Sequence, residues 1–248
     1  MEEEKKDVRV YREGDVGVIH LDAPPLNLIN RKFKEDLDEA VAWAEKEAGL
    51  RVVIIRNSGK YFGAGGDVNE MKEKDYHVDK LDGIIQRIGA LPMPTIAAMD
   101  GGAFGGSFEI ALACDMRIAA RGSILGLTEV NFGSFPGVGG TPRIIQLMGR
   151  AKAMEVMLLA YRWPAEEWMR YGVINAVPDL ESAYDMALRW ANLICQKPAS
   201  GPRAVKEAVS CFAEPACREF LPHQHRIMEA LAGKSDIMES SKAFLNKH

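Results

Sequence analysis

The hydrophobic pattern at the start of the chain alternates with polar positions, as in a half-buried β-strand. Apolar residues recur at every second position in residues 8–11 and again in residues 16–21, with a glycine-containing triplet at residues 13–15 between the two runs. Two alternating runs joined by a short turn are typical of a β-hairpin. The sequence therefore predicts that the chain opens with two antiparallel strands.

The pattern then changes from a period of two to a helical period. After the strand-breaking segment 22–25, apolar residues recur three or four positions apart, at Phe33, Leu37, Val41 and Ala44. This spacing places one apolar stripe along a helix. Asn30 is suited to the N-cap and Gly49 to the end of the helix, so an amphipathic helix is expected between them.

Two continuous apolar runs, in residues 51–56 and 95–99, lack this alternation. Such runs are typical of strands that are covered on both faces, as in parallel sheets. Residues 116–119 and 123–127 are predicted as two short strands, and residues 171–177 as a last strand. All the expected strands thus precede the C-terminal quarter of the chain.

Helical segments alternate with these strands. They surround residues 78–88 and 180–195, and the chain is mainly helical from Thr141 onward. Alternating strands and helices predict an α/β fold with a largely parallel sheet. We therefore divide the chain into a core of residues 1–197 and a C-terminal region of residues 198–248, which has no strand pattern and is predicted to form several short helices.

Composition is that of an ordinary globular protein. Of 248 residues, 47% are hydrophobic and 27% charged, which is ample for a core. The net charge of −4 argues against nucleic acid or an anionic membrane as the main partner. The four cysteines lack CxxC spacing, the N-terminal residues lack a signal-peptide pattern, and no apolar run approaches the ~20 residues of a membrane span. We expect a cytoplasmic protein with reduced thiols.

A glycine-rich segment, residues 101–109, is the first candidate for chemistry. It holds four glycines in nine residues and runs into an apolar helix-forming segment, so it predicts a tight turn that opens a buried helix. The first N–H groups of a helix lack internal partners and favour an anion or a developing oxyanion. Glu109, three residues after Gly106, is a candidate acid or base on the same face. Taken alone, the segment is equally well explained as a packing turn followed by an exposed glutamate.

A second glycine loop, residues 63–67, also follows a buried strand. Ligands of α/β folds bind at the carboxyl ends of strands, so the two loops are predicted to converge on one pocket. Glu129 stands at the end of a short strand, before a loop rich in glycine and proline. Two carboxyl groups in one dry pocket have displaced, coupled pKa values and can divide the roles of acid and base.

Several common sites are absent from the sequence. There is no GxGxxG after the first strand, no GxxxxGK[ST] and no GxSxG around Ser107 or Ser134, which argues against dinucleotide, P-loop and serine-hydrolase sites. The histidines match no HExxH, and the pair His223 and His225 is better explained as solvated surface than as metal ligands. No metal site is predicted.

Taken together, the motifs resemble those of the enoyl-CoA hydratase/isomerase (crotonase) superfamily. The resemblance runs over nearly the whole chain. It rests on the loop at residues 25–27, the segment YFGAGGDV at 61–68, GGSFEIA at 105–111, Glu129, and PGVGGTPR at 136–143.

The resemblance implies a fold, a ligand and an assembly. The implied fold is a crotonase-like spiral of ββα units with a C-terminal helical region that forms homotrimers or dimers of trimers. The implied ligand is an acyl-CoA thioester, with no metal or redox cofactor, and its carbonyl would lie between the N–H groups of Ala64 and Gly106. The residues implied to contact the substrate and its CoA moiety are Pro25, Leu26, Ala64, Gly65, Gly66, Asp67, Val68, Gly106, Pro136 and Gly137.

The paired glutamates indicate the reaction. Hydratases of the superfamily use two glutamates for syn addition of water across the C2=C3 bond of a 2-enoyl-CoA, as in fatty-acid β-oxidation, and this chain has both, Glu109 and Glu129. Glu109 is expected to deprotonate water and Glu129 to protonate C2. Three alternatives stay open: isomerisation of a 3-enoyl-CoA by Glu129 alone, hydration of a cyclic or branched dienoyl-CoA, and a non-catalytic acyl-CoA-binding subunit. Phe108, where relatives often have a smaller residue, is a candidate for shaping the acyl pocket.

Overall fold

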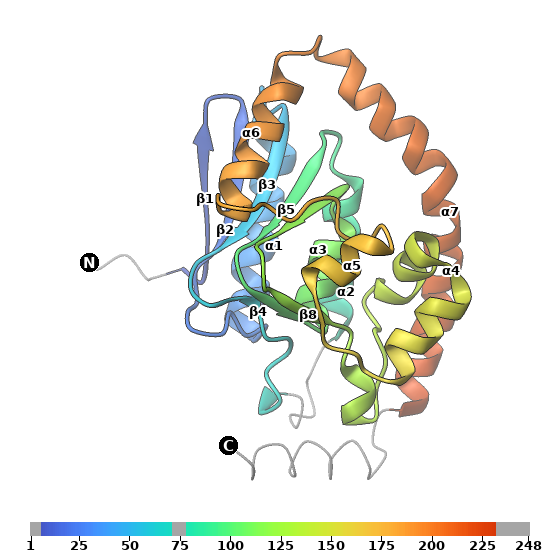
Figure 1. The fold of residues 1–248 in the computed structure, drawn as a ribbon. Helices are drawn as coiled ribbons and strands as arrows, with labels where there is room; N and C mark the ends of the chain where they lie inside the picture. Colours follow the sequence, from blue (N-terminus) through green and yellow to red (C-terminus); the bar gives the residue numbers. More distant parts are fainter. Residues whose placement is uncertain (1–5, 71–77, 232–248) are drawn as a thin grey trace, which may run out of the picture.

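The computed structural model describes residues 6–70 and 78–231 (Figure 1). Its larger sheet has the strand order β1-β2-β3-β5-β7, with β1 antiparallel to β2 and the other neighbours parallel. These strands are β1 (Val8–Glu13), β2 (Val16–Leu21), β3 (Val52–Asn57), β5 (Thr95–Met99) and β7 (Met116–Ala119). The smaller sheet, in the order β4-β6-β8-β9, consists of β4 (Tyr61–Gly63), β6 (Gly102–Phe104), β8 (Ile124–Gly126) and β9 (Trp163–Pro164).

A unit of two strands and a helix recurs along the chain. The first strand of each unit joins the larger sheet, the second joins the smaller sheet, and a helix follows. The three units are β3-β4-α2 (Val78–Ala90), β5-β6-α3 (Gly106–Ala113), and β7-β8 followed by the short 3₁₀ helix η2 (Glu129–Phe132) and α4 (Gly140–Leu158). This repetition agrees with the predicted spiral of ββα units.

Helices cover the larger sheet on both faces. Val52 and Ile54 of β3 pack with α6 (Ala183–Cys195), whereas Val53 and Ile55 face the cluster that contains α1 (Arg31–Lys46). Successive side chains of a strand point to opposite faces, so both sets are buried. This explains why the apolar runs of the central strands show no polar alternation.

Most predicted elements of the core are confirmed, with one exception. The hairpin and the helix after Asn30 form as expected, and the Asn30 side chain accepts the N–H of Phe33 at 2.8 Å. The strand predicted at residues 171–177 is wrong, because only Ala176 bridges a strand, at Ile118. The segment follows α5 (Ala165–Arg170), and its Asn175 N–H and Val173 carbonyl are hydrogen-bonded to Arg117.

The C-terminal region differs from the prediction of several short helices. Residues 200–231 form a single helix, α7 (Ser200–Leu231), and the rest of the predicted region, residues 232–248, lies outside the described residues. In Figure 1, α7 runs alongside α4, on the side of the molecule away from β1. Lys206 anchors the start of α7 to the core through Asp115 at 2.8 Å, and Gln224 contacts the core near its end. None of the helices in the described segments is long and apolar enough to cross a membrane.

Candidate active site

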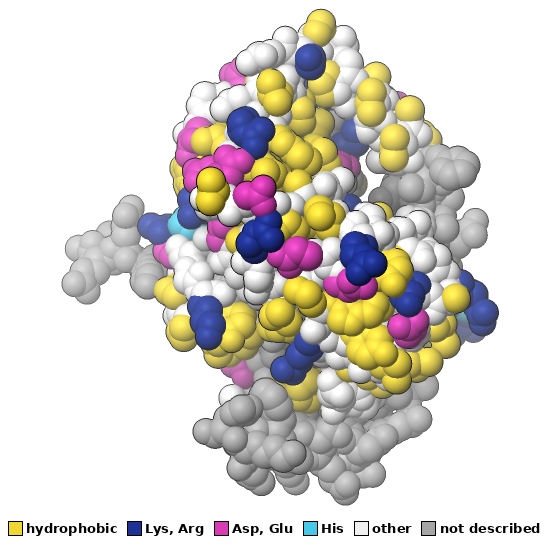
Figure 2. All heavy atoms as spheres, in the orientation of Figure 1, with side chains coloured by type: hydrophobic (Ala, Val, Ile, Leu, Met, Phe, Trp, Pro, Cys, Tyr) yellow, Lys and Arg dark blue, Asp and Glu magenta, His cyan; other side chains and the backbone are white. Residues whose placement is uncertain are grey.

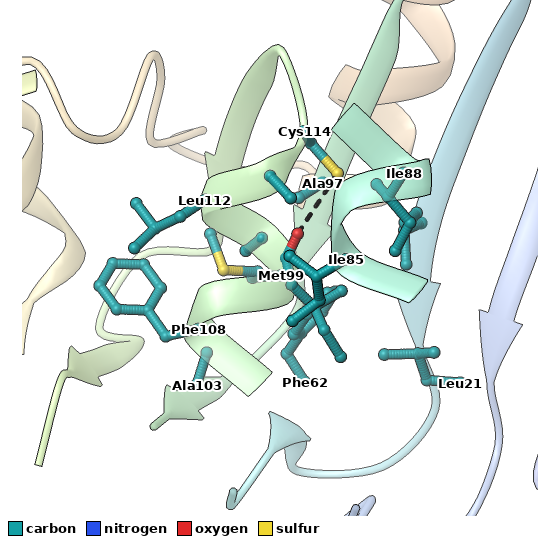
Figure 3. Close-up of a cluster of buried hydrophobic side chains, with 14 of the residues drawn as sticks. Leu21, Phe62, Ile85, Ile88, Ala97, Met99, Ala103, Phe108, Leu112 and Cys114 are labelled. Atoms are coloured by element: carbon teal, nitrogen blue, oxygen red, sulfur yellow. Dashed lines mark hydrogen bonds between the residues drawn. The ribbon is translucent and has the colours of Figure 1, made fainter. Parts of the chain in front are cut away.

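Helix α3 brings a glutamate into the interior of the protein. The helix begins at Gly106, directly after Gly105, whose φ of 53° lies in the region that favours glycine. Residues 107–113 are all buried, and Figure 3 shows Phe108 and Leu112 of α3, with Cys114 directly after the helix, among the apolar side chains of the core. Glu109 is consequently only 2% exposed. The alternative of an exposed glutamate after a packing turn is therefore wrong.

The Glu109 carboxyl group is held by the turn that precedes α4. Its Oε1 atom accepts the N–H of Val138 at 3.0 Å and the N–H of Gly140 at 2.7 Å. Burial raises the pKa of Glu109 to about 7, while these two hydrogen bonds and the nearby Arg143 act to lower it. Glu109 thus exchanges its proton near neutral pH, which suits a general base.

The carboxyl group of Glu129 is also buried but, unlike that of Glu109, it accepts no hydrogen bond in the described part of the chain. It is the first residue of η2, and both of its carboxyl oxygens are buried without a hydrogen-bond partner in the described part of the chain. Its Oε1 lies 3.3 Å from the position that a Cβ on Gly105 would occupy, beside the start of α3. Burial, followed by repulsion from Glu109, raises the pKa of Glu129 well above its ordinary value. The protonated form is favoured, so Glu129 is suited to donate a proton.

The two glycine loops meet, as predicted. The N–H of Gly65 donates to the Ser107 hydroxyl at 3.2 Å. A Cβ on Gly63 would lie 2.2 Å from the same Ser107 Oγ, so only glycine allows this approach. The loop after β4 therefore rests directly on the first turn of α3.

The hydrogen bonds of the second loop bear on the predicted role of the Ala64 N–H as a donor to the thioester carbonyl. The Ala64 N–H donates to the Leu26 carbonyl at 2.9 Å, so it is engaged within the fold and not free for a ligand oxygen. Gly65 is engaged by Ser107. Among the described residues we find no acceptor for the N–H of Gly66 or of Gly106. The N–H groups of Gly66 and Gly106 thus have no acceptor in the described part of the chain, whereas that of Ala64 has one.

The candidate CoA-contacting residues fall into two groups. Backbone hydrogen bonds from Ile29 to Gly65 and from Asp67 to Ile29 join the loop after β4 to the loop that holds Pro25 and Leu26, which are both exposed. Val68 continues this loop and is partly exposed. Pro136 and Gly137 are buried and lead directly into the Val138–Gly140 turn at Glu109.

Sequence reasoning missed three side chains around the site. Ser107 receives the second loop, and Arg143 donates to the Gly139 carbonyl at 3.1 Å. Gln224, which lies between the two histidines considered for metal binding, is fully buried and accepts the Gly139 N–H at 3.2 Å. Neither Ser107 nor Gln224 has a local sequence signal, because their partners are 42 and 85 residues away.

The comparison with known proteins agrees with this geometry. The family described as enoyl-CoA hydratase/isomerase matches residues 11–248. The chain belongs to the enoyl-CoA hydratase/isomerase family. It is similar to a short-chain-enoyl-CoA hydratase of Clostridium acetobutylicum, with 33% identity over 98% of this chain and 96% of that protein.

Two further relatives extend over nearly the same length. A probable enoyl-CoA hydratase of Mycobacterium bovis is 32% identical over 97% of this chain and 95% of its own. The crystal structure of an enoyl-CoA hydratase from Mycobacterium avium subsp. paratuberculosis K-10 superposes with a TM-score of 0.88 and 23% identity, covering 98% of this chain and 96% of that chain. The family and its fold thus apply to the whole described molecule.

Proposed function

We propose that this protein is an enoyl-CoA hydratase, a hydro-lyase that adds water across the C2=C3 bond of a 2-enoyl-CoA. The observation that carries the proposal is the unequal environment of two buried carboxyl groups. Glu109 accepts two N–H groups and has a pKa of about 7, whereas the oxygens of Glu129 have no partner in the described part of the chain and its pKa is well above the ordinary value. One base and one acid side by side are what hydration requires.

In the proposed mechanism the thioester carbonyl oxygen accepts hydrogen bonds from the N–H groups of Gly66 and Gly106. These donors stabilise the negative charge that develops on this oxygen, and loss of one such donor typically costs ~10²–10³ in rate. Glu109, as its carboxylate, takes a proton from water while the water oxygen bonds to C3. Glu129, as its acid, gives a proton to C2. The two carboxyl groups then return to their starting states by exchanging protons with water.

The reaction adds H and OH to the substrate without changing its overall oxidation state, so it needs no redox cofactor, and in the proposal the two N–H donors stabilise the thioester oxygen without a metal ion. The CoA moiety would lie along the paired loops of residues 25–29 and 64–68. Leu26 and Pro25 are exposed there, as a contact with a ligand at the surface requires. The acyl group would extend from the start of α3, where Ile29 and Leu81 lie within 3.4 Å of the position that a Cβ on Gly106 would occupy.

A second candidate function is isomerisation of a 3-enoyl-CoA to the 2-enoyl-CoA. It is favoured by one observation: of the two glutamates, Glu129 has both carboxyl oxygens without a protein partner in the described residues, whereas Glu109 accepts two N–H groups. A single carboxyl group can carry a proton from C2 to C4. Turnover of matched 2-enoyl and 3-enoyl CoA esters by the purified protein separates the two. Faster hydration of the 2-enoyl esters supports the proposal, and faster isomerisation of the 3-enoyl esters contradicts it.

The proposed assembly is a homotrimer or a dimer of trimers. Leu158 and Leu159, at the end of α4, are 60% and 58% exposed, and Met154 and Met169 are also exposed. Figure 2 shows apolar side chains gathered over the region of α4 and α5. Exposed apolar patches commonly mark protein interfaces. Gel filtration tests the assembly, because a mass near the 27.4 kDa of one chain would contradict it.

A further inference from the structure

Three consecutive backbone N–H groups connect the C-terminal helix with Glu109. The N–H groups of Val138 and Gly140 donate to the Glu109 Oε1 atom. The N–H between them, that of Gly139, donates instead to the Oε1 atom of Gln224 on α7. Gln224 is 0% exposed, although it lies 85 residues further along the chain. One side chain of α7 thus determines how the middle peptide of this turn is held.

The carbonyl group of Gly139, on the other side of this turn, is also held by a side chain. Arg143 of α4 donates to the Gly139 carbonyl at 3.1 Å and to Gln86 of α2 at 3.3 Å. Gly139 has a φ of +99°, and a Cβ on it would lie 2.1 Å from Arg143 Nη1. The N–H of Gly139 is therefore fixed by Gln224 and its carbonyl by Arg143, which together set the orientation of the turn.

A second contact ties the same part of α7 to α2. His225 Nε2 lies 3.2 Å from one carboxyl oxygen of Asp82, and Gln86 donates to the other oxygen at 3.2 Å. Among the described residues, the charged groups that act on Glu109 are Asp82 of α2, Glu129 of η2 and Arg143 of α4, and His225 of α7 contacts Asp82. Gln224 adds no charge to this set, so its effect on Glu109 is one of geometry.

We propose that Gln224 is a positioning residue, which holds the Gly139 peptide so that the flanking Val138 and Gly140 N–H groups point at the Glu109 carboxylate. Only the activity readout of this inference rests on the proposed function. The C-terminal helix would then contribute to the site of its own chain, because it holds the turn that orients the proposed base.

A substitution at Gln224 can distinguish the proposed positioning role from a role in packing alone. Its Nε2 atom is buried without a partner in the described part of the chain. Gln224→Met has a similar length, removes this orphaned donor and also removes the acceptor for Gly139. The variant exchanges one orphaned donor, the Gln224 Nε2, for another, the Gly139 N–H, so stability alone does not decide the role of Gln224. If Gln224 only filled space, the variant would be as active as the parent.

We expect Gln224→Met to lower kcat roughly ten- to hundredfold, because the base is misplaced, while KM changes little. The acidic limb of the pH–rate profile should move to higher pH, since hydrogen bonds from Val138 and Gly140 lower the pKa of Glu109 and would be weakened. Gln224→Glu keeps the acceptor and should restore the plateau value of kcat.

Lys206→Gln is the matched control. Lys206 is also a buried polar residue of α7, but it binds Asp115 and the Met93 carbonyl, away from the turn. It should lower the melting temperature without moving the pH limb. Equal effects of Gln224→Met and Lys206→Gln on kcat and on the pH limb would overturn the inference, and so would a parent-like Gln224→Met.

An infrared titration of the Glu109 carboxyl group, taken as the difference between each protein and its Glu109→Gln form, gives the same answer without turnover. The Glu109 band should titrate at higher pH in Gln224→Met than in the parent. An unchanged titration contradicts the role of Gln224 whether or not the protein hydrates a CoA ester. A parent that hydrates none of the esters instead contradicts the proposed function alone.

Discussion

The Glu109 Oε1 atom lies 2.7 Å from the backbone nitrogen of Gly140, the first residue of α4. This contact joins the helix that carries the proposed base to the unit that follows it in the spiral. It also explains why Gly140 is glycine, because a Cβ there would lie 2.6 Å from the same oxygen.

Gly140→Ala tests whether this contact matters for catalysis. The added methyl group has to displace the Glu109 carboxyl group, and a displacement of about 1 Å at a reacting group can cost about 10²-fold in rate. We expect a loss of kcat of this order in a steady-state hydration assay. Gly83→Ala on the exposed face of α2, where nothing lies within 4 Å, is the control and should keep full activity. Equal activity of the two variants would show that the Glu109 position is not critical.

Ser107→Ala tests the contact between the two glycine loops. The change leaves the buried N–H of Gly65 without its acceptor, which typically costs about 1–3 kcal/mol, and loosens the neighbouring Gly66 N–H. We expect kcat/KM to fall by about tenfold, roughly the rate equivalent of 1.4 kcal/mol. Ser182→Ala removes a similar hydroxyl acceptor, at the N-cap of α6, and should reduce stability but not kcat/KM. A parent-like kcat/KM in Ser107→Ala would argue against the role of this loop.

The raised pKa of Glu109 predicts how stability depends on pH. A carboxyl group whose pKa rises on folding, here from 4.5 to about 7, stabilises the fold fully below pH 4.5, and this contribution is lost as the pH rises through 7. Glu109→Gln keeps an oxygen for the Val138 and Gly140 N–H groups but cannot ionise. Relative to the parent, it should therefore gain about 2–3 kcal/mol of unfolding free energy between about pH 4.5 and about pH 8.5.

Urea denaturation of both proteins at the two pH values, at equal protein concentration, measures this difference. Gly83→Ala, which changes no titratable group at an exposed position where nothing lies within 4 Å, serves as a variant whose stability change should be independent of pH over this range. A constant difference between parent and Glu109→Gln would mean that Glu109 titrates as an ordinary exposed glutamate.

Local patterns in the sequence predicted an α/β fold with a largely parallel sheet and the two candidate glutamates, whereas the spiral of ββα units was implied by the resemblance to the crotonase superfamily. The strand and helix periods of β2, β3 and α1 are set by neighbouring residues, and Gly106 and Glu109 are close in sequence. Residues 171–177 were mistaken for a strand because buried apolar residues such as Val173 and Ile174 look alike in a strand and in a packed loop. Their backbone is bound by the side chain and backbone of Arg117, which a local pattern does not reveal.

Other features depend on contacts between distant segments. The use of the Ala64 N–H by Leu26 and the place of Gln224 beside Gly139 follow from tertiary packing, so no sequence window contains them. Phe108 was a candidate for shaping the acyl pocket, but it is 0% exposed and packs edge-on against Trp168 at 5.2 Å between ring centroids. The structure thus explains this larger side chain by core packing between α3 and α5.

The most direct test of the account is the hydration of crotonyl-CoA by the parent, Glu109→Gln and Glu129→Gln. The reaction is measured as the loss of absorbance of the conjugated enoyl thioester. Removing a general acid or base typically lowers the rate ~10²–10⁴-fold, so both variants should lose kcat by this order while binding of a CoA ester, measured by calorimetry, stays nearly unchanged. Unchanged turnover in both variants would contradict catalysis by the paired glutamates.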